Sequence, residues 1–238
     1  QLHRRQRQMC IRDSATTASE KARLKFYIPE YKKKSKSKND DRLIMRTSKI
    51  ERITNETKIN LFLKLDGVGK STVKTCIPFL DHVLDQLVFH SSIDLELNAE
   101  GDIEIDFHHT VEDCGICLGK AFMEALGDKK GINRYGFFLL PMDDALIRVA
   151  LDFSGRSFLS WKVNFPTNRV GNFDLELVRE FFNAFSTNSG ATLHVEMLDG
   201  FNSHHISEAI FKAMGKSIKM AVAKNKGVEM IPSTKGSL

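Results

Sequence analysis

The spacing of apolar residues predicts a mixed α+β structure. Ile59, Leu61 and Leu63 recur at every second position, as in a strand with one buried face, and a strand pair is expected within 49–65. Residues 92–100 show the same period, and the pattern resumes over 102–106 after the Glu100-Gly101 turn signal. Residues 79–90 and 110–126 place apolar side chains at helical spacing. We therefore expect strands over 92–100 and 102–106, and helices over 79–90 and 110–126.

The same order of elements recurs in the second part of the chain. Strands are expected over 145–151, 157–163 and 191–197, and helices over 175–185 and 207–223. The segment that begins at Leu80 parallels the one that begins at Val178, and His90 parallels Asn188. We interpret this as an internal duplication, with halves at about 45–130 and 131–238 that pack helices on a sheet and face each other across a pseudo-twofold axis.

Composition separates a leader from the rest of the chain. Residues 1–44 hold 13 Lys/Arg against 5 Asp/Glu, whereas the other residues hold 22 against 25, so the net charge of +5 comes from the leader. We expect the leader to be a disordered, basic, dispensable tail. Because the chain opens with Gln, Met45 is a candidate native start, and the leader an upstream translated segment or a cloning remnant.

Membrane-spanning, secreted and nucleic-acid-binding proteins are disfavoured by this composition. No apolar run approaches the roughly eighteen residues of a membrane span, and the polar N-terminus lacks a secretory signal. The residues after the leader are mildly acidic, which argues against nucleic-acid binding.

Cys114-x-x-Cys117 has no second cysteine pair to complete a zinc site, so we interpret it as two small residues packed on a helix. A reducing cytoplasm fits best.

Two His-His-x-x-Glu motifs carry the candidate chemistry. On a helix, His108 and Glu112 share a face because they are four residues apart, while the adjacent His109 is rotated by about 100°. His204, His205 and Glu208 repeat this arrangement 96 residues later. Each motif can therefore serve two metal ions, and imidazole with carboxylate suits Mn, Fe, Zn or similar ions. The sequence alone does not choose among them.

The duplication supplies further candidate ligands. His82 corresponds to Glu180, and both stand on the helix ahead of a motif. His90 pairs with Asn188 and His194 with Glu96, which are weaker pairings. We expect His194, inside an apolar strand, to be structural.

Six segments together resemble the imidazoleglycerol-phosphate dehydratase family. They are 54–57 (Thr-Asn-Glu-Thr), 78–86, 106–113, 151–156, 202–208 and the tail 232–236, and the resemblance covers about residues 46–238. It implies a duplicated α+β fold like domain 2 of ribosomal protein S5. It also implies a lyase of histidine biosynthesis that dehydrates imidazole glycerol phosphate to imidazole acetol phosphate. Members form a large homo-oligomer, a 24-mer, with manganese at subunit interfaces.

The resemblance also assigns the metal ligands. One ion takes His82, His109, His204 and Glu208, and the other takes His108, Glu112, Glu180 and His205. Some members have His in place of Glu180, but a carboxylate can bind the same ion. Two ions on the ring nitrogens would favour an imidazolate form of the substrate, which can expel a hydroxyl.

Catalytic roles are implied for Glu56, His82 and Glu208. Glu56 lies outside the metal motifs and is the expected acid/base, since metal-bound carboxylates have their lone pairs committed. The implied substrate contacts are Glu56, His82, Asp85, Gln86, His108, Glu112, Arg134, Arg156, His204, Lys212, Ser233, Thr234 and Lys235. Arg and Lys suit the phosphate. Asp143-Asp144 departs from the Asp-Glu that is usual in the family.

Two other functions are compatible with parts of the pattern. Paired metals also activate water in phosphate-ester hydrolases, although those sites are usually rich in Asp, and release of inorganic phosphate would identify one. An RNA-binding protein with a basic arm would show salt-dependent affinity that is lost without residues 1–44.

Overall fold

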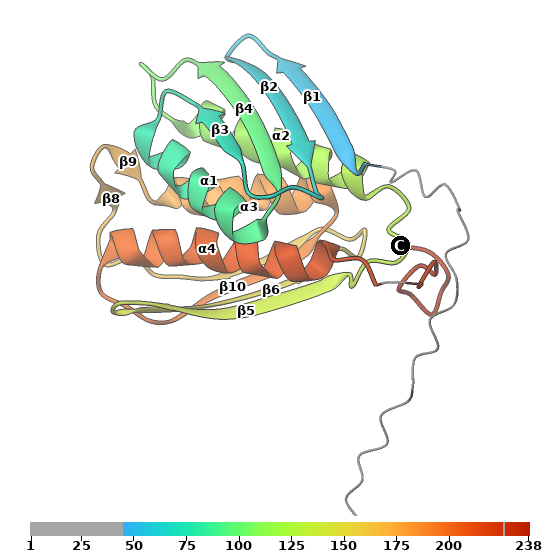
Figure 1. Ribbon diagram of the computed structural model, residues 1–238. Helices are drawn as coiled ribbons and strands as arrows, with labels where there is room; N and C mark the ends of the chain where they lie inside the picture. Colours follow the sequence, from blue (N-terminus) through green and yellow to red (C-terminus); the bar gives the residue numbers. More distant parts are fainter. Residues whose placement is uncertain (1–44, 226) are drawn as a thin grey trace, which may run out of the picture. The chain divides into compact units, whose positions relative to one another are not determined.

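Two four-stranded sheets enclose a layer of four helices (Figure 1). The structure is a computed structural model that describes residues 45–225 and 227–238. The predicted leader, residues 1–44, therefore lies outside the described residues. No helix in the described part of the chain is long and apolar enough to span a bilayer.

Each half of the chain supplies one sheet and two helices. The first half consists of β1 (Thr47–Ile53), β2 (Thr57–Lys64), β3 (Ser71–Lys74), α1 (Pro78–Ser91), β4 (Asp94–Gly101) and α2 (His108–Leu126). The second consists of β5 (Tyr135–Met142), β6 (Ala145–Asp152), β7 (Phe158–Lys162), α3 (Glu176–Ser189), β10 (Thr192–Asp199) and α4 (Ser203–Val222). A short hairpin, β8 (Arg169–Val170) and β9 (Phe173–Asp174), precedes α3.

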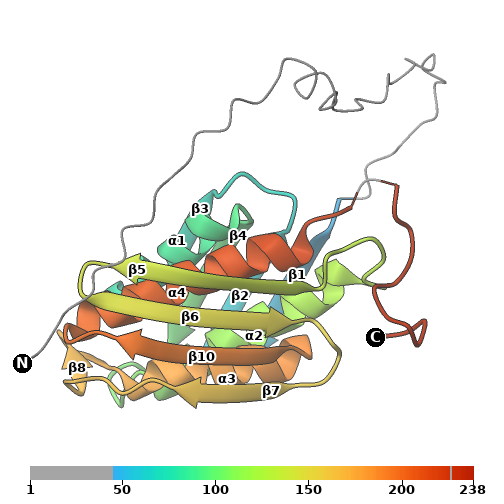
Figure 2. The same ribbon diagram turned by 90° about the horizontal axis from the view of Figure 1, so that it is seen from below.

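The two sheets have the same topology, which confirms the predicted duplication. Their strand orders are β1-β2-β4-β3 (Figure 1) and β5-β6-β10-β7 (Figure 2), and in each the last pair is parallel. The inner face of β2 buries Ile59, Leu61 and Leu63, as the alternation predicted. The α+β fold class is thus confirmed.

The halves contact each other through their helices. Helix α2 packs on α3, and α1 packs on α4. Gly119 on α2 permits the first contact, because a Cβ there would lie 2.7 Å from the carbonyl oxygen of Phe185. Gly215 on α4 permits the second, where a Cβ would lie 2.6 Å from the carbonyl oxygen of Leu87. These equivalent glycines show that one helix packing is used twice.

Three expectations about elements need correction. Residues 102–106 form a turn rather than a strand, with the Ile105 amide donating to the Asp102 carbonyl and no neighbouring strand to pair with. Strands β3 and β5 and the short hairpin of β8 and β9 were not predicted. Helices α2 and α4 begin at His108 and Ser203, earlier than expected, so both histidine pairs lie in a first helical turn.

Candidate metal centre

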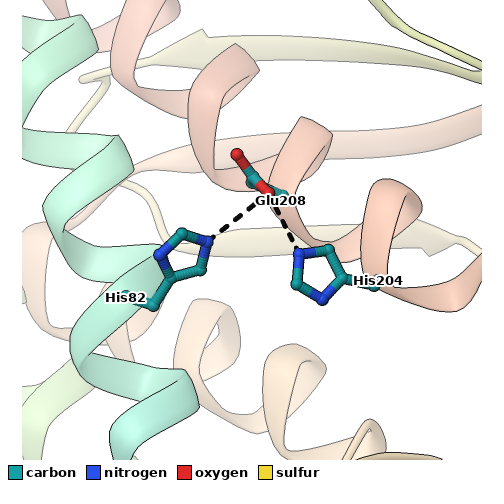
Figure 3. Close-up of side chains that lie close together, drawn as sticks. All are labelled: His82, His204 and Glu208. Carbon is teal, nitrogen blue, oxygen red and sulfur yellow. Dashed lines mark hydrogen bonds and ion pairs between the residues drawn. The ribbon is translucent and has the colours of Figure 1, made fainter.

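Three side chains from two helices form a metal-competent cluster. His82 of α1 and His204 of α4 both point at the Glu208 carboxylate (Figure 3). Their Nε2 atoms lie 3.4 Å and 3.2 Å from Glu208 Oε2. One nitrogen or oxygen from each residue lies within 4.8 Å of the others, and this is the only such group in residues 45–225 and 227–238.

Local structure explains how α4 presents its two ligands. Asn202 caps the helix by accepting hydrogen bonds from the backbone N–H groups of His204 and His205, at 2.9 Å and 3.3 Å. His204 and Glu208 then share a face, one turn apart. The α1–α4 packing brings His82 to that face, so the third member comes from tertiary structure rather than from the motif.

Charge around Glu208 favours the ionised carboxylate. Burial acts to raise the pKa of Glu208, but Lys212 and then His82 outweigh it, so this pKa lies below its usual range. Lys212 Nζ is 2.7 Å from Glu208 Oε1. The cluster therefore offers a negative oxygen beside two imidazole nitrogens, a donor set that fits a divalent transition-metal ion.

The equivalent cluster in the other helix pair is more open. His108 Nε2 lies 4.0 Å from Glu112 Oε2, and both side chains are more than 40% exposed. Glu180 stands on α3, which packs on the helix that carries this pair. Its carboxylate is 3.0 Å from Arg179 Nη1. The described structure does not gather these three groups as tightly as His82, His204 and Glu208.

The second histidine of each motif is held by a carboxylate. His109 Nδ1 lies 3.0 Å from Asp102 Oδ2, and His205 Nδ1 lies 2.5 Å from Asp144 Oδ1. Because a carboxylate only accepts, each Nδ1 carries the proton and Nε2 keeps the lone pair for a metal. The Asp102 bond raises the pKa of His109, and the His205 bond lowers the pKa of Asp144.

These two histidines do not join the ligands assigned with them. Within one chain, His109 is outside the cluster of His82, His204 and Glu208. His205 Nε2 instead faces Asp143 Oδ2 at 3.7 Å. A single chain thus gathers three of the four ligands expected for one ion.

Glu56 lies at the tip of the β1–β2 hairpin, close to His109. Its Oε1 is 3.9 Å from His109 Nε2, and its side chain is 55% exposed. The Glu56 N–H donates to Thr54 Oγ1 at 3.1 Å, and its carbonyl accepts from the Asp102 N–H at 3.2 Å. The backbone is therefore fixed while the carboxylate has no hydrogen bond in the described structure.

The residues expected at the phosphate lie in three places. Lys212 is at the metal cluster, Arg156 is exposed after β6, and Arg134 is buried. Arg134 Nε and Nη2 donate to Asp152 at 2.6 Å and 3.0 Å, and Nη1 donates to the Pro232 carbonyl at 3.0 Å. Two of its five N–H groups have no hydrogen-bond partner within residues 45–225 and 227–238.

A cavity connects Arg134 to the C-terminal tail. It has a volume of about 530 Å³, and Arg134, Ser233 and Thr234 are among the residues that line it. Lys235 is exposed beyond this rim. Asp85 and Gln86 lie on α1, where Asp85 accepts a hydrogen bond from Ser71 of β3. The structure does not bring this pair into the metal cluster.

The remaining candidates, His90, His194 and the cysteine pair, lie outside the metal cluster. His90 is half-buried, and burial, followed by Lys216 and Lys212, lowers its pKa. His194 lies on the exposed side of β10, 5.8 Å from the ring of Phe158. Cys114 and Cys117 are buried on α2, where burial raises the pKa of Cys117 to about 11. That pKa suits an unreactive packed thiol.

Sequence reasoning missed three carboxylates beside the site: Asp102, Asp113 and Asp144. Asp102 follows the turn signal at Gly101, and Asp113 ends the first motif segment. Asp144 was noticed only as a departure from a family pattern. A rule that each metal-binding His needs an orienting acceptor would have prompted a search for the first and last of these.

Comparisons with known proteins agree on one family. The family model described as imidazoleglycerol-phosphate dehydratase matches residues 75–218. Dehydratases of that name from Cereibacter sphaeroides and Ruegeria pomeroyi are 56% and 57% identical over 195 and 196 residues, which is 82% of this chain and 100% of each relative.

Solved structures of such dehydratases have the same fold. The crystal structure from Staphylococcus aureus matches with a TM-score of 0.69 and 37% identity, over 75% of this chain and 99% of the other. The Pyrococcus furiosus structure in complex with (S)-C348 matches with a TM-score of 0.69 and 34% identity, over 79% of this chain and 100% of the other.

Proposed function

This chain belongs to the imidazoleglycerol-phosphate dehydratase family, and we propose that it dehydrates imidazole glycerol phosphate to imidazole acetol phosphate in histidine biosynthesis. The single observation that carries the proposal is the clustering of His82, His204 and Glu208 in a chain of this family. It acts as a hydro-lyase on a phosphorylated imidazole.

The metal centre is proposed to hold two divalent ions, with manganese as the expected metal. Tightly clustered His82, His204 and Glu208 support the first site. His108, Glu112 and Glu180, which occupy equivalent positions in the duplicate, support the second. When bound, the ions would supply Lewis acidity that favours the imidazolate form of the substrate ring.

We propose that each ion is completed by a second copy of the chain. Metal ions of this kind take four or more ligands, whereas one chain clusters three at the first site and gathers the second set less tightly. Asp102 and Asp144 orient His109 and His205 through Nδ1, and Nε2 of each makes no hydrogen bond in the described structure, so both are suited to bind an ion at a neighbouring subunit. Exposed Tyr135, Phe137 and Leu139 on β5 give an apolar surface for such assembly. These features support the proposal of a large homo-oligomer.

Glu56 is proposed to move the proton. The product carries a ketone on the second carbon from the ring, so the hydroxyl on the first carbon and the hydrogen on the second leave as water. The resulting enol becomes the ketone when the first carbon gains a proton and the hydroxyl on the second loses one. Glu56 has an exposed carboxylate without a hydrogen-bond partner in the described structure, on a hairpin fixed beside His109. It can therefore accept the proton from the second carbon without giving up another bond.

The phosphate is proposed to bind at the far end of the site. Lys212, Arg134 and Arg156 supply positive charge, and Ser233, Thr234 and Lys235 supply donors from the tail. The cavity that joins Arg134 to Ser233 and Thr234 supports this assignment, since two N–H groups of Arg134 have no hydrogen-bond partner among the described residues. Asp85 and Gln86 stay proposed contacts of the substrate.

Turnover of imidazole glycerol phosphate, measured with and without added Mn²⁺, tests the proposal. We expect the ketone product to form only in the metal-loaded protein, without release of inorganic phosphate. Phosphate release instead of ketone formation would identify a metallohydrolase. The cytoplasm is the proposed location, because Cys76, Cys114 and Cys117 are free thiols.

A further inference from the structure

A buried polar trio joins the β1–β2 hairpin to α2. Thr57 Oγ1 donates to Asp113 Oδ2 at 2.5 Å, and Arg52 Nη2 lies 2.9 Å from Asp113 Oδ1. Asp113 is only 8% exposed, so its charge needs both partners. Arg52 and Thr57 flank the hairpin loop on either side, with Glu56 between them. The Asp113 carboxylate of α2 therefore contacts both β1 and β2 next to the loop.

The trio connects to Glu56 through a chain of hydrogen bonds. The one hydroxyl hydrogen of Thr57 is committed to Asp113, so at the 3.1 Å contact Thr54 donates to the Thr57 oxygen. Thr54 Oγ1 in turn accepts from the backbone N–H groups of Glu56 and Thr57, at 3.1 Å and 2.9 Å. Hydrogen bonds linked in such a chain polarise and strengthen one another. The position of the Glu56 backbone is therefore tied to Asp113.

The duplicated half shows that the fold does not need this trio. The hairpin pairs Ile53 with Lys58 in the first half and Pro141 with Leu146 in the second, which aligns the two loops residue by residue. The positions that match Arg52, Thr57 and Asp113 are Leu140, Ala145 and Ala209. All three are apolar and no more than 7% exposed. The same packing forms there without any buried charge.

The two loops differ in what their acidic residue does. Asp144 matches Glu56, and its carboxylate is fully used: Oδ1 contacts His205, and Oδ2 accepts from the N–H groups of Phe201 and Asn202 at 2.7 Å and 2.8 Å. Asp144 thus anchors its own loop. If Glu56 anchored its loop in the same way, its carboxylate would be occupied by hydrogen bonds. The first loop therefore needs another residue as its anchor.

We propose that Asp113 is a positioning residue that, through Thr57 and Arg52, holds the Glu56 loop beside His109 while leaving the Glu56 carboxylate uncommitted. The inference rests on the proposed role of Glu56 as the acid/base. Asp113 touches neither substrate nor metal in this scheme. Its effect on the reaction passes through the loop.

Thr57→Val is the main test, because it removes the hydroxyl and keeps the shape. Misplacing a catalytic group by about 1 Å can cost on the order of 10²-fold, so we expect kcat to fall by about tenfold to a hundredfold. KM should change less than about threefold, since the substrate's binding groups are untouched. Metal content and particle size should stay at parental values. Thr57→Ser, which restores the hydroxyl, should return kcat to within about twofold.

A second variant and a control separate positioning from stability. The triple variant Arg52→Leu, Thr57→Ala, Asp113→Ala installs the second half's residues and should lose kcat as Thr57→Val does. Ser48→Ala is the matched control, because Ser48 Oγ donates to Glu124 Oε2 at 2.6 Å and joins the same strand and helix at their other end. It should leave kcat unchanged.

A double-mutant cycle with Glu56→Gln decides the outcome. If Asp113 acts through Glu56, Thr57→Val adds no further loss of kcat in the Glu56→Gln background. An equal loss in both backgrounds would overturn the inference, as would a Thr57→Val enzyme with parental kcat. In either of those outcomes, a Glu56→Gln enzyme that is slow by itself would still support Glu56 as the acid/base, so the proposed function would stand. If Glu56→Gln itself is fully active, the role of Glu56 and this inference fail together.

Discussion

Replacing Glu56 by Gln removes a charge from the proposed acid/base and changes little else. The side chain is 55% exposed, and its nearest charged partner is His109, 3.9 Å away. The two backbone hydrogen bonds of Glu56, to Thr54 and from Asp102, do not involve the substituted group. Surface substitutions of this kind change the free energy of unfolding by about 0.5 kcal/mol or less. The variant should fold, bind metal and assemble normally.

The expected loss in rate is much larger than that structural effect. General acid/base catalysis contributes about 10²–10⁴-fold. At about 1.36 kcal/mol for each factor of ten, the activation free energy should rise by about 2.7–5.4 kcal/mol. The amide cannot accept the proton, whereas substrate binding depends on other groups. The loss should therefore appear in kcat, with KM nearly unchanged.

Steady-state formation of the ketone product measures kcat, while elemental analysis and light scattering report metal content and assembly. Glu100→Gln is the control, since Glu100 is an exposed acid near the end of β4 in the same sheet. It should match the parent protein. A Glu56→Gln enzyme that turns over within about threefold of the parent would refute the assignment of Glu56 as acid/base. A slow variant that has also lost metal would refute the view that this side chain is separate from the metal centre.

Three further predictions follow from the same structure. Chelation should shrink the particle seen by light scattering, because ligands from two copies complete each ion and a ligand of the assembled state stabilises it; an unchanged particle with its metal removed would contradict this. Gly119→Ala or Gly215→Ala should lower Tm by up to about 8 °C, since overpacking against a backbone carbonyl costs about 1–3 kcal/mol and the better helix propensity of Ala returns about 1 kcal/mol; a raised Tm in calorimetry would show that the neighbouring helix shifts without cost. Iodoacetamide at pH 8 should label exposed Cys76 at least about tenfold faster than buried Cys114 and Cys117, as measured by peptide mapping, and equal rates would show that α2 opens readily.

Periodicity along the sequence predicted most of the architecture because it is a local property. The run Ile59, Leu61, Leu63 is buried on β2, and apolar spacing located both helices that carry the histidine motifs, although each begins two to four residues earlier than predicted. The duplication was visible from repeated spacing alone. Strand β5 was missed because its apolar side chains occupy both faces, with Phe137 and Leu139 exposed, so no alternation marks it.

The sequence also determined which histidine shares a face with which carboxylate. His204 and Glu208 meet because residues four apart on a helix are neighbours, and no tertiary information is needed for that. The capping of α4 by Asn202 is local in the same way. These features depend only on backbone geometry within one or two turns.

Tertiary structure alone decided which distant groups meet. His82 reaches Glu208 only because α1 packs on α4 at Gly215, and the sequence spacing between them carries no such information. Likewise, Asp113 and Thr57 are far apart in the chain but in contact across the layer between sheet and helix. Side chains separated by many residues come together through the packing of whole elements, which depends on the summed fit of the core rather than on any local pattern.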